Sequence, residues 1–247
     1  MPDKKNIFKL IYIGAAVILF LTLILFASPL PRWLGYKHQA DLRGRILRGV
    51  AWFGFNQRAK LSGWEEKIFQ GRVQYSIKSD RKGTYLNAYS RNSASGIIYW
   101  LKFSPSSNPM VSWKWKVVKF PKKTPTPKTD NWWIEKDDYA ARFYLIFPRF
   151  PFFRMQCLEY VWDQYLPAET IIANPNFSNL KIIVAESGVK NTGKWVTIER
   201  NVYDDFKKAF GSVPGNVGAI AIMTDSDNSA SIAEAQYNDI EVGYGKQ

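Results

Sequence analysis

The sequence predicts an all-β domain, a sandwich or barrel with one short helix, preceded by an N-terminal transmembrane helix. From Gly71 onward, short runs rich in Val, Ile, Tyr, Trp and Thr alternate with Gly, Pro, Asn and Ser at intervals of about 8–15 residues, which is typical of such folds. Leu10–Ala27 is apolar and uncharged. Because 247 residues suffice for one sizeable core, we expect a single β-domain over residues 71–247.

Residues 1–30 are expected to form a membrane anchor or signal segment. Leu10–Ala27 is close in length to the roughly 20 residues that cross a bilayer as a helix. Its end matches the A-x-A-like cleavage site of a signal peptide poorly. The sequence therefore favours an uncleaved signal anchor, with a cleaved signal peptide as the alternative. The basic N-terminus favours a domain outside the cytoplasm, whereas the arginines after Pro31 favour the reverse. We expect the domain outside.

Residues 31–70 are expected to form a basic juxtamembrane linker. Within Gly35–Gly71, apolar residues recur with helical spacing among arginines, although glycines weaken the pattern. These apolar residues are Leu42, Ile46, Leu47, Val50 and Trp52. The interpretation is an amphipathic linker helix.

Ten strands and one helix are predicted in the domain from the period of the apolar residues. The strands are Val73–Ser79, Thr84–Ser90, Gly96–Phe103, Met110–Val118, Asp138–Phe147, Leu158–Asp163, Lys181–Glu186, Lys194–Asn201, Val217–Met223 and Ala233–Val242. Tyr203–Phe210 has helical spacing and ends before Gly211. Phe120–Trp133, rich in proline and lysine, is predicted to be a long exposed loop.

The alternation within these strands predicts which side chains face the core. In the fourth strand, Trp113, Trp115 and Val117 share the core face, and lysines share the other. In the fifth strand the predicted core residues are Tyr139, Ala141, Phe143, Leu145 and Phe147. Asp138 and Arg142 then lie together on the opposite face.

Six stretches occur in a fixed order: SASGIIYWLKF, SWKWKV, DDYAARFYLIF, LEYVWD, GKWVTIERNVYDDFKKAFG and AIAIMTDSDNSASIAEAQYNDI. In that order they resemble an uncharacterised bacterial family, domain of unknown function 3047. The similarity covers Gly71–Val242. The resemblance implies an exported or envelope-associated protein with a galactose-binding-like jelly-roll β-sandwich, and it implies no established activity.

Composition excludes several chemistries. The only histidine, His38, precedes the domain, which excludes Ser-His-Asp or Cys-His catalysis and a zinc site with several imidazoles there. Cys157 is interpreted as a small buried hydrophobic residue. The whole chain has a net charge of +13, and its basic excess lies before Asp130, where 23 Lys/Arg occur with 5 Asp/Glu; Arg81–Thr129 contains no acidic residue. This excess favours a surface near anionic lipid or an acidic polysaccharide, and nucleic acid is not expected because no motif for it occurs.

Carboxylates and aromatic residues remain as candidate ligand-binding groups. If the strands that carry them are neighbours, they form one polar, partly aromatic floor. The predicted floor residues are Asp138, Arg142, Glu159, Trp195 and Glu199. A guanidinium bonds two oxygens at once, which suits a sugar or a carboxylate, and the indole of Trp195 offers a stacking surface. For Asp137 and Asp138 with Arg142, an internal ion pair at the entrance of the strand is favoured over a binding site.

The segment AIMTDSDNSA raises the question of a metal site. Asp225, Asp227 and Asn228 have the alternate spacing by which calcium collects oxygen ligands, but the glycine and terminal glutamate of an EF-hand are absent. The alternative is a turn whose side chains bond their own backbone. We expect a structural turn and no cofactor, with Asp225 and Asp227 as weak calcium candidates and Asp137, Asp138 or Asp239 as the nearest further donors.

Together these features predict a single-pass protein of the bacterial inner membrane whose domain lies on the periplasmic or extracytoplasmic side. The domain is expected to bind carbohydrate or another anionic envelope polymer without catalysis. A structural or protein-interaction module of the envelope is the alternative. A glycosidase or polysaccharide lyase would need two carboxylates across a cleft, and the sequence does not select a pair.

Overall fold

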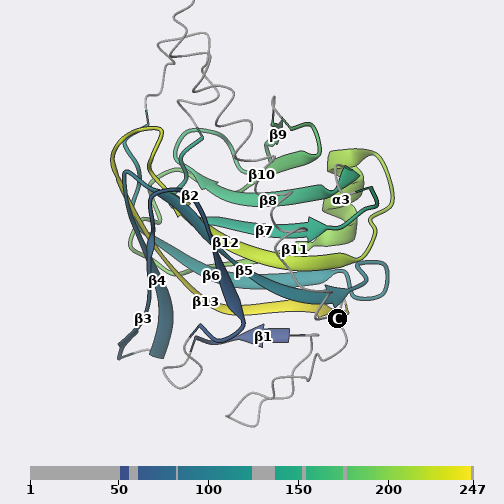
Figure 1. Cartoon of the computed structure of the whole chain (residues 1–247), viewed down its shortest axis with the longest axis horizontal. Coiled ribbons are helices and arrows are strands. Elements are labelled where there is room, and N and C mark those ends of the chain that lie inside the picture. Colours follow the sequence, from purple (N-terminus) through teal and green to yellow (C-terminus); the bar gives the residue numbers. More distant parts are fainter. Residues whose placement is uncertain are drawn as a thin grey trace, which may run out of the picture.

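The computed structural model describes residues 51–55, 61–81, 83–123, 137–151, 154–174 and 177–245. They form a β-sandwich of two sheets with one short helix (Figure 1). The predicted anchor Leu10–Ala27 lies outside the described residues, as does most of the predicted loop Phe120–Trp133. Within the described ranges, no helix is long and apolar enough to cross a membrane.

Sheet A has the strand order β11-β6-β13-β4-β3, and β1 pairs with β13. Its strands are β1 (Ala51–Phe53), β3 (Gln74–Asp80), β4 (Gly83–Arg91), β6 (Met110–Lys119), β11 (Val196–Asn201) and β13 (Ile232–Tyr244). All of these pairings are antiparallel. The long strand β13 therefore joins β4 and β1 on one side to β6 on the other.

Sheet B has the strand order β2-β5-β12-β7-β8-β10-β9. Its strands are β2 (Trp64–Gln70), β5 (Ala94–Phe103), β7 (Arg142–Phe147), β8 (Gln156–Asp163), β9 (Ile171–Ala173), β10 (Leu180–Ser187) and β12 (Val217–Asp225). Only the pairing of β8 with β10 is parallel within this sheet. Strands β7, β8 and β12 are buried along their whole length.

Aromatic side chains of the two sheets meet in the core. Trp113 and Trp115 of β6 are fully buried, and the Trp113 ring stacks on Phe143 of β7 with centroids 4.6 Å apart. Burying a large apolar side chain contributes about 1.5–3 kcal/mol. Phe143, Leu145 and Phe147 belong to this core, so the predicted faces of β6 and of these β7 residues are confirmed.

The predicted helix is confirmed as α3 (Val202–Phe210), which lies at one end of the strands (Figure 1). The Asn201 side chain accepts a hydrogen bond from the backbone N–H of Asp204, and Gly211 ends the helix in the left-handed conformation at φ 67°. Phe206 packs on Phe147 of β7 with ring centroids 4.7 Å apart. The helix therefore closes one end of the core.

Two predictions about elements are wrong. The amphipathic helix predicted within Gly35–Gly71 is wrong for two segments of that range. These segments form the strands β1 and β2, which pair with β13 and β5. The strand predicted from Asp138 begins at Arg142, because the preceding backbone turns toward the end of β12, where the Asp225 carboxylate accepts the Tyr139 N–H at 2.8 Å. The short strand β9 was not predicted from the sequence pattern.

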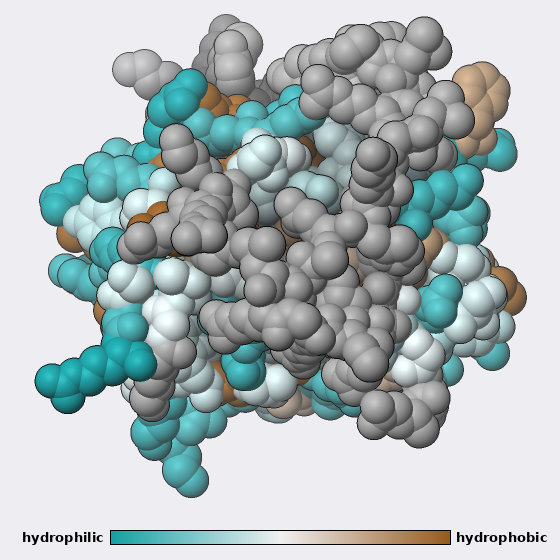
Figure 2. Space-filling model, turned by 90° about the horizontal axis from the view of Figure 1, so that it is seen from below, coloured by the Kyte–Doolittle hydropathy of each residue, from teal (hydrophilic) through white to brown (hydrophobic). Residues whose placement is uncertain are grey.

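The face seen in Figure 2 is mostly hydrophilic where described residues are visible. Hydrophobic side chains are scattered over it rather than gathered in one large patch. Scattered apolar side chains are normal on a protein surface and do not mark an interface.

Candidate functional site

The five residues predicted to line one floor lie on two different sheets, so the single floor is wrong. Asp138 precedes β7, Arg142 begins β7 and Glu159 lies on the neighbouring strand β8 of sheet B, and all three are buried. Trp195 and Glu199 lie at the β11 edge of sheet A, the first half-buried and the second exposed. The reason is that β11 pairs with β6 and not with a strand of sheet B.

Arg142 is the centre of a buried group that we call the arginine cluster. Its Nη1 lies 3.2 Å from Oε1 of Glu159 and donates a hydrogen bond to the Tyr144 hydroxyl at 3.0 Å. Its Nη2 lies 2.9 Å from Oδ2 of Asp225 and 3.1 Å from Oδ1 of Asp137. The predicted internal ion pair is thus confirmed between Arg142 and Asp137, whereas Asp138 contacts the backbone of Asn228 and Ser229 instead.

Burial and an excess of carboxylates set the electrostatics of the arginine cluster. Burial raises the pKa of Glu159 to about 7, although the nearby Arg142 opposes the shift. Burial also raises the pKa of Asp225. Oε2 of Glu159 and Nε of Arg142 are buried without a hydrogen-bond partner. Burying the cluster is therefore costly, and its carboxyl groups bind their protons more tightly than the same groups do when exposed to water.

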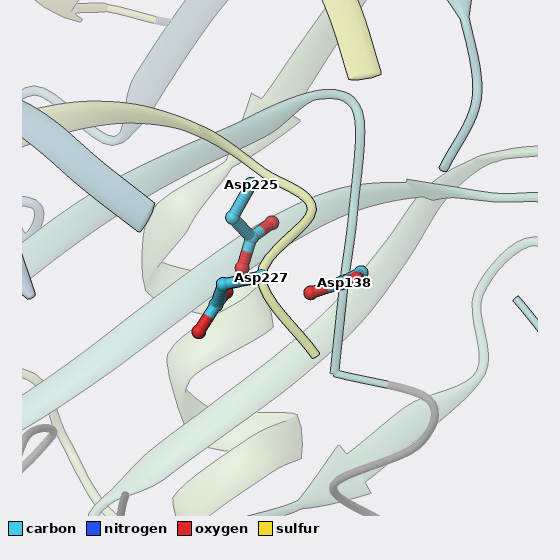
Figure 3. A group of neighbouring side chains, drawn as sticks. All are labelled: Asp138, Asp225 and Asp227. Atoms are coloured by element: carbon cyan, nitrogen blue, oxygen red, sulfur yellow. The ribbon is translucent and has the colours of Figure 1, made fainter. Parts of the chain in front are cut away.

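Asp138 holds the turn that follows β12. Its carboxylate accepts hydrogen bonds from the backbone N–H groups of Asn228 at 3.2 Å and Ser229 at 2.7 Å. Carboxylate oxygens of Asp138, Asp225 and Asp227 all lie within 4.8 Å of one another (Figure 3). Burial, and then the charge of Asp138, raise the pKa of Asp227 to about 6. The segment after Asp225 is a turn. Two of its backbone N–H groups are satisfied by Asp138, which lies before β7, and not by side chains of the turn itself.

These three aspartates are the group that could hold a metal ion among the described residues. Calcium takes 6–8 oxygen ligands. Asp138 and Asp225 already accept hydrogen bonds, and Arg142 places a positive charge beside Asp225. The other donors considered are engaged as well, since Asp137 pairs with Arg142 at 3.1 Å and Asp239 pairs with Lys114 at 2.8 Å. The donor set is thus small and largely engaged.

The outer side of sheet A holds a second group, the aromatic face, made of Tyr85, Lys116, Trp195, Gln236 and Asn238. Tyr85 and Trp195 meet edge to face with ring centroids 5.8 Å apart. Nζ of Lys116 lies 5.7 Å from the Tyr85 ring and 5.1 Å from the Trp195 ring. Strands β6 and β13 separate β4 from β11, a backbone distance of about 14 Å at the usual strand spacing. The two rings therefore lean toward each other across the sheet.

Amide side chains continue the aromatic face toward β4. Gln236 of β13 lies opposite Lys116 of β6 and opposite Asn87 of β4, and its Nε2 donates to Oδ1 of Asn87 at 3.3 Å. Oε1 of Gln236 and Oδ1 of Asn238 are buried without a hydrogen-bond partner. An unsatisfied buried acceptor costs about 1–3 kcal/mol. A ligand that supplies donors would satisfy these two oxygens if the side chains that cover them moved aside.

Glu199 lies on β11 opposite Ser112 of β6, four residues after Trp195. Its Oε2 accepts a hydrogen bond from the Tyr244 hydroxyl at 2.9 Å. Of the predicted floor residues, the structure thus brings Arg142 and Glu159 into contact, places Asp138 beside Asp225, and leaves Trp195 and Glu199 on the other sheet.

Sequence reasoning missed Tyr85, Lys116 and Gln236 on the aromatic face, and Tyr144 in the arginine cluster. The alternation of VSWKWKVV did place Lys116 outward, opposite Trp115. It could not show that β4 and β11 lie on one sheet with two strands between them. The sheet order is the information that joins these residues.

Comparisons with solved structures give similar β-sandwiches at low identity. The family 11 carbohydrate-binding module of the cellulase Lic26A-Cel5E of Clostridium thermocellum is 13% identical, with 86% of this chain and 96% of that chain covered and a TM-score of 0.42. The family 30 carbohydrate-binding module of Cel9D-Cel44B from the same organism is 10% identical, with coverages of 75% and 93% and a TM-score of 0.40. The K3 cleaved adhesin domain of Lys-gingipain of Porphyromonas gingivalis is 10% identical, with coverages of 79% and 99% and a TM-score of 0.37.

A search of curated proteins finds no significant match. A family model matches residues 62–241, more than half of the chain, and its description is "Protein of unknown function (DUF3047)". The match begins two residues before β2 and ends within β13, so it covers most of the sandwich. The resemblance seen in the six sequence stretches is confirmed, and the chain belongs to the DUF3047 family of proteins of unknown function.

Proposed function

We propose that the domain binds carbohydrate without catalysis, and that the aromatic face of sheet A is the binding surface. The observation that carries this proposal is the aromatic pair Tyr85 and Trp195 beside two unsatisfied amide oxygens. A sugar ring presents C–H groups that pack on aromatic rings and hydroxyls that donate to amide oxygens. The aromatic face offers both kinds of partner within one sheet surface.

A noncatalytic role follows from where the carboxylates lie. A glycosidase needs a general acid with a raised pKa beside a second carboxylate. Glu159, whose pKa is raised to about 7, is buried on β8 of sheet B, and Asp227, whose pKa is raised to about 6, lies half-buried in the turn after β12 of the same sheet. Near the aromatic face, Asp239 pairs with Lys114 and Glu234 with Lys78. This arrangement supports binding over cleavage.

The finer features of the proposal concern the fold and its setting. We take the sandwich to be a galactose-binding-like jelly roll, held by Leu10–Ala27 on the outer side of the bacterial inner membrane. A fluorescent protein that matures only in the cytoplasm, fused after Gln247, should stay dark in cells. Bright cells would reverse the orientation.

The binding proposal is tested on an array of envelope polysaccharides. Trp195→Ala and Tyr85→Ala are expected to abolish retention of the domain, because each removes one ring of the platform. The matched control is Tyr203→Ala on α3, where Lys207 lies 5.6 Å from the Tyr203 ring in a similar lysine-aromatic pair. Retention should persist in this control.

A domain that binds no glycan favours the protein-interaction alternative. Loss of binding in Tyr203→Ala as well would contradict the assignment to sheet A. If the domain instead cleaves a glycan and Glu159→Gln stops turnover, the protein is an enzyme and the arginine cluster is its site.

A further inference from the structure

Lys116 differs from the other lysines on the outer side of sheet A. Lys114 pairs with Asp239 at 2.8 Å, and Lys78 approaches Glu234 at 3.9 Å. In the part of the chain that the structure describes, Lys116 has no carboxylate within ion-pair distance, and its cross-strand neighbour is the neutral Gln236. It is a half-buried cation without a counter-ion in the middle of the proposed binding surface.

The aromatic rings around Lys116 do not replace that counter-ion. A cation near an aromatic face gains about 0.5–1 kcal/mol at exposed sites. The ammonium group keeps its full charge and has three N–H donors. It is held between two rings, so its position is more restricted than that of a free surface lysine. The site therefore contains a fixed positive charge that an anionic ligand group would neutralise.

The groups near Lys116 suit the rest of such a ligand. Gln236 and Asn238 each have a buried amide oxygen without a hydrogen-bond partner, which would accept a hydrogen bond from a ligand hydroxyl once the side chains covering it move, and which repels anions. The lysine is thus the position for the acidic group, the amides are positions for hydroxyls, and the aromatic rings take the face of the sugar. We infer that the aromatic face recognises an acidic glycan, whose anionic group binds Lys116. This inference rests on the proposed function and specifies its ligand.

The test uses two matched pairs of polymers, so that carboxylate and sulfate groups are distinguished. One pair is polygalacturonate and its carboxyl-reduced neutral form, and the other is dextran sulfate and dextran. We expect the domain to bind the acidic member of at least one pair about tenfold more tightly than the neutral member, measured by isothermal titration calorimetry. Lys116→Met should remove this preference, so that the variant binds the acidic and neutral members of each pair with similar affinity.

The matched control is Lys207→Met on α3, which removes the same charge beside another aromatic ring. It should leave the preference unchanged. Equal binding of acidic and neutral members by the unmodified domain would overturn the inference while leaving carbohydrate binding intact. Equal loss of the preference in Lys116→Met and Lys207→Met would also overturn it, because the net charge alone would then be responsible. Failure to bind any of the four polymers counts against this ligand class, and failure on the polysaccharide array counts against the proposed function itself.

Discussion

The arginine cluster of sheet B and the aromatic face of sheet A contain the same ingredients in opposite settings. Each has one central cation beside aromatic rings and polar side chains. The Arg142 side chain is 5% exposed and lies within reach of three carboxylates, whereas Lys116 is half-buried and has no carboxylate partner among the described residues. The first cation is satisfied within the protein, and the second is available to a ligand. Comparing them separates groups that hold the fold from groups that can bind.

The physical difference is the dielectric environment. Coulomb attraction strengthens when charges leave water, but each buried charge also loses its hydration. A buried cluster therefore tolerates the loss of a partner poorly. A charge on an open face is screened by water and salt, so removing it changes binding more than folding. Substitutions in the two regions should give opposite patterns.

The largest effect is expected for Arg142→Met. Removing the guanidinium leaves Asp137, Glu159 and Asp225 buried without their shared cation, which should lower the free energy of unfolding by about 3–5 kcal/mol at pH 8. Urea unfolding followed by tryptophan fluorescence measures this. The control is Arg91→Met, because Arg91 is exposed at the end of β4. This substitution should change the free energy of unfolding by about 0.5 kcal/mol or less. A loss below about 1 kcal/mol for Arg142→Met would show that the cluster is not structural.

The second effect is a dependence of the free energy of unfolding on pH, which arises from the protonation of Glu159. Its pKa is raised from 4.5 to about 7 in the folded protein, so the folded state keeps a proton that the unfolded state releases between these values. The stability that Glu159 contributes is therefore fully present below pH 4.5 and is lost as the pH rises through about 7. The loss is on the order of a few kcal/mol. Glu159→Gln should flatten the curve of urea midpoint against pH.

The matched control for the pH effect is Glu199→Gln, on the exposed side of β11. It should leave the pH curve close to that of the unmodified protein. If Glu159→Gln and Glu199→Gln give parallel curves, then the proton held by the cluster resides on another carboxylate.

The third effect contrasts two tryptophans of sheet A. Trp113→Ala removes a fully buried ring that stacks on Phe143, and we expect it to cost about 3–5 kcal/mol of unfolding free energy. Trp195→Ala removes a half-buried ring whose described ring contacts are Tyr85 and Lys116, and a loss of about 1 kcal/mol is expected. Thermal and urea unfolding of both variants check this. A loss for Trp195→Ala as large as that for Trp113→Ala would make the aromatic face part of the core.

Period-2 alternation predicted which side of each strand is apolar, and therefore the core. It placed Trp113 correctly because buried residues alternate with lysines along β6, and it placed Phe143 correctly although β7 is buried on both faces. It could not predict that the polar side of sheet B near Arg142 is also buried, since alternation does not show what covers a face. The partners Arg142 and Asp225 are far apart in sequence and meet because β7 pairs with β12.

The aromatic face was beyond sequence reasoning for a related reason. Trp195 was identified as a stacking residue from its position on GKWVTIER, but its partner Tyr85 lies on β4, which is separated from β11 by two strands of the sheet. Sheet order depends on how long-range pairs form, and it leaves no local pattern in the sequence. Residues 64–70 were wrongly included in the predicted linker helix. The helical spacing ends at Trp52, and residues 64–70 form β2, which pairs with β5.

The smallest effect is expected for calcium, which tests whether the turn after β12 is only structural. Asp138 already accepts N–H groups of Asn228 and Ser229, and Asp225 accepts the Tyr139 N–H and lies beside Arg142. Of these three aspartates, Asp227 is the one whose carboxylate accepts a hydrogen bond from its own backbone. Because calcium needs 6–8 oxygens and this group offers few, millimolar calcium or EDTA should leave the melting temperature unchanged.

A specific calcium site would behave differently. At a hundredfold excess over its dissociation constant, bound calcium would stabilise the fold by about 2.7 kcal/mol and raise the melting temperature by several degrees. Such a rise, lost in Asp227→Asn and retained in Asp239→Asn, whose carboxylate pairs with Lys114 on sheet A, would contradict the turn interpretation. It would also change the comparison between the two regions, because the arginine cluster would then adjoin a ligand site of its own.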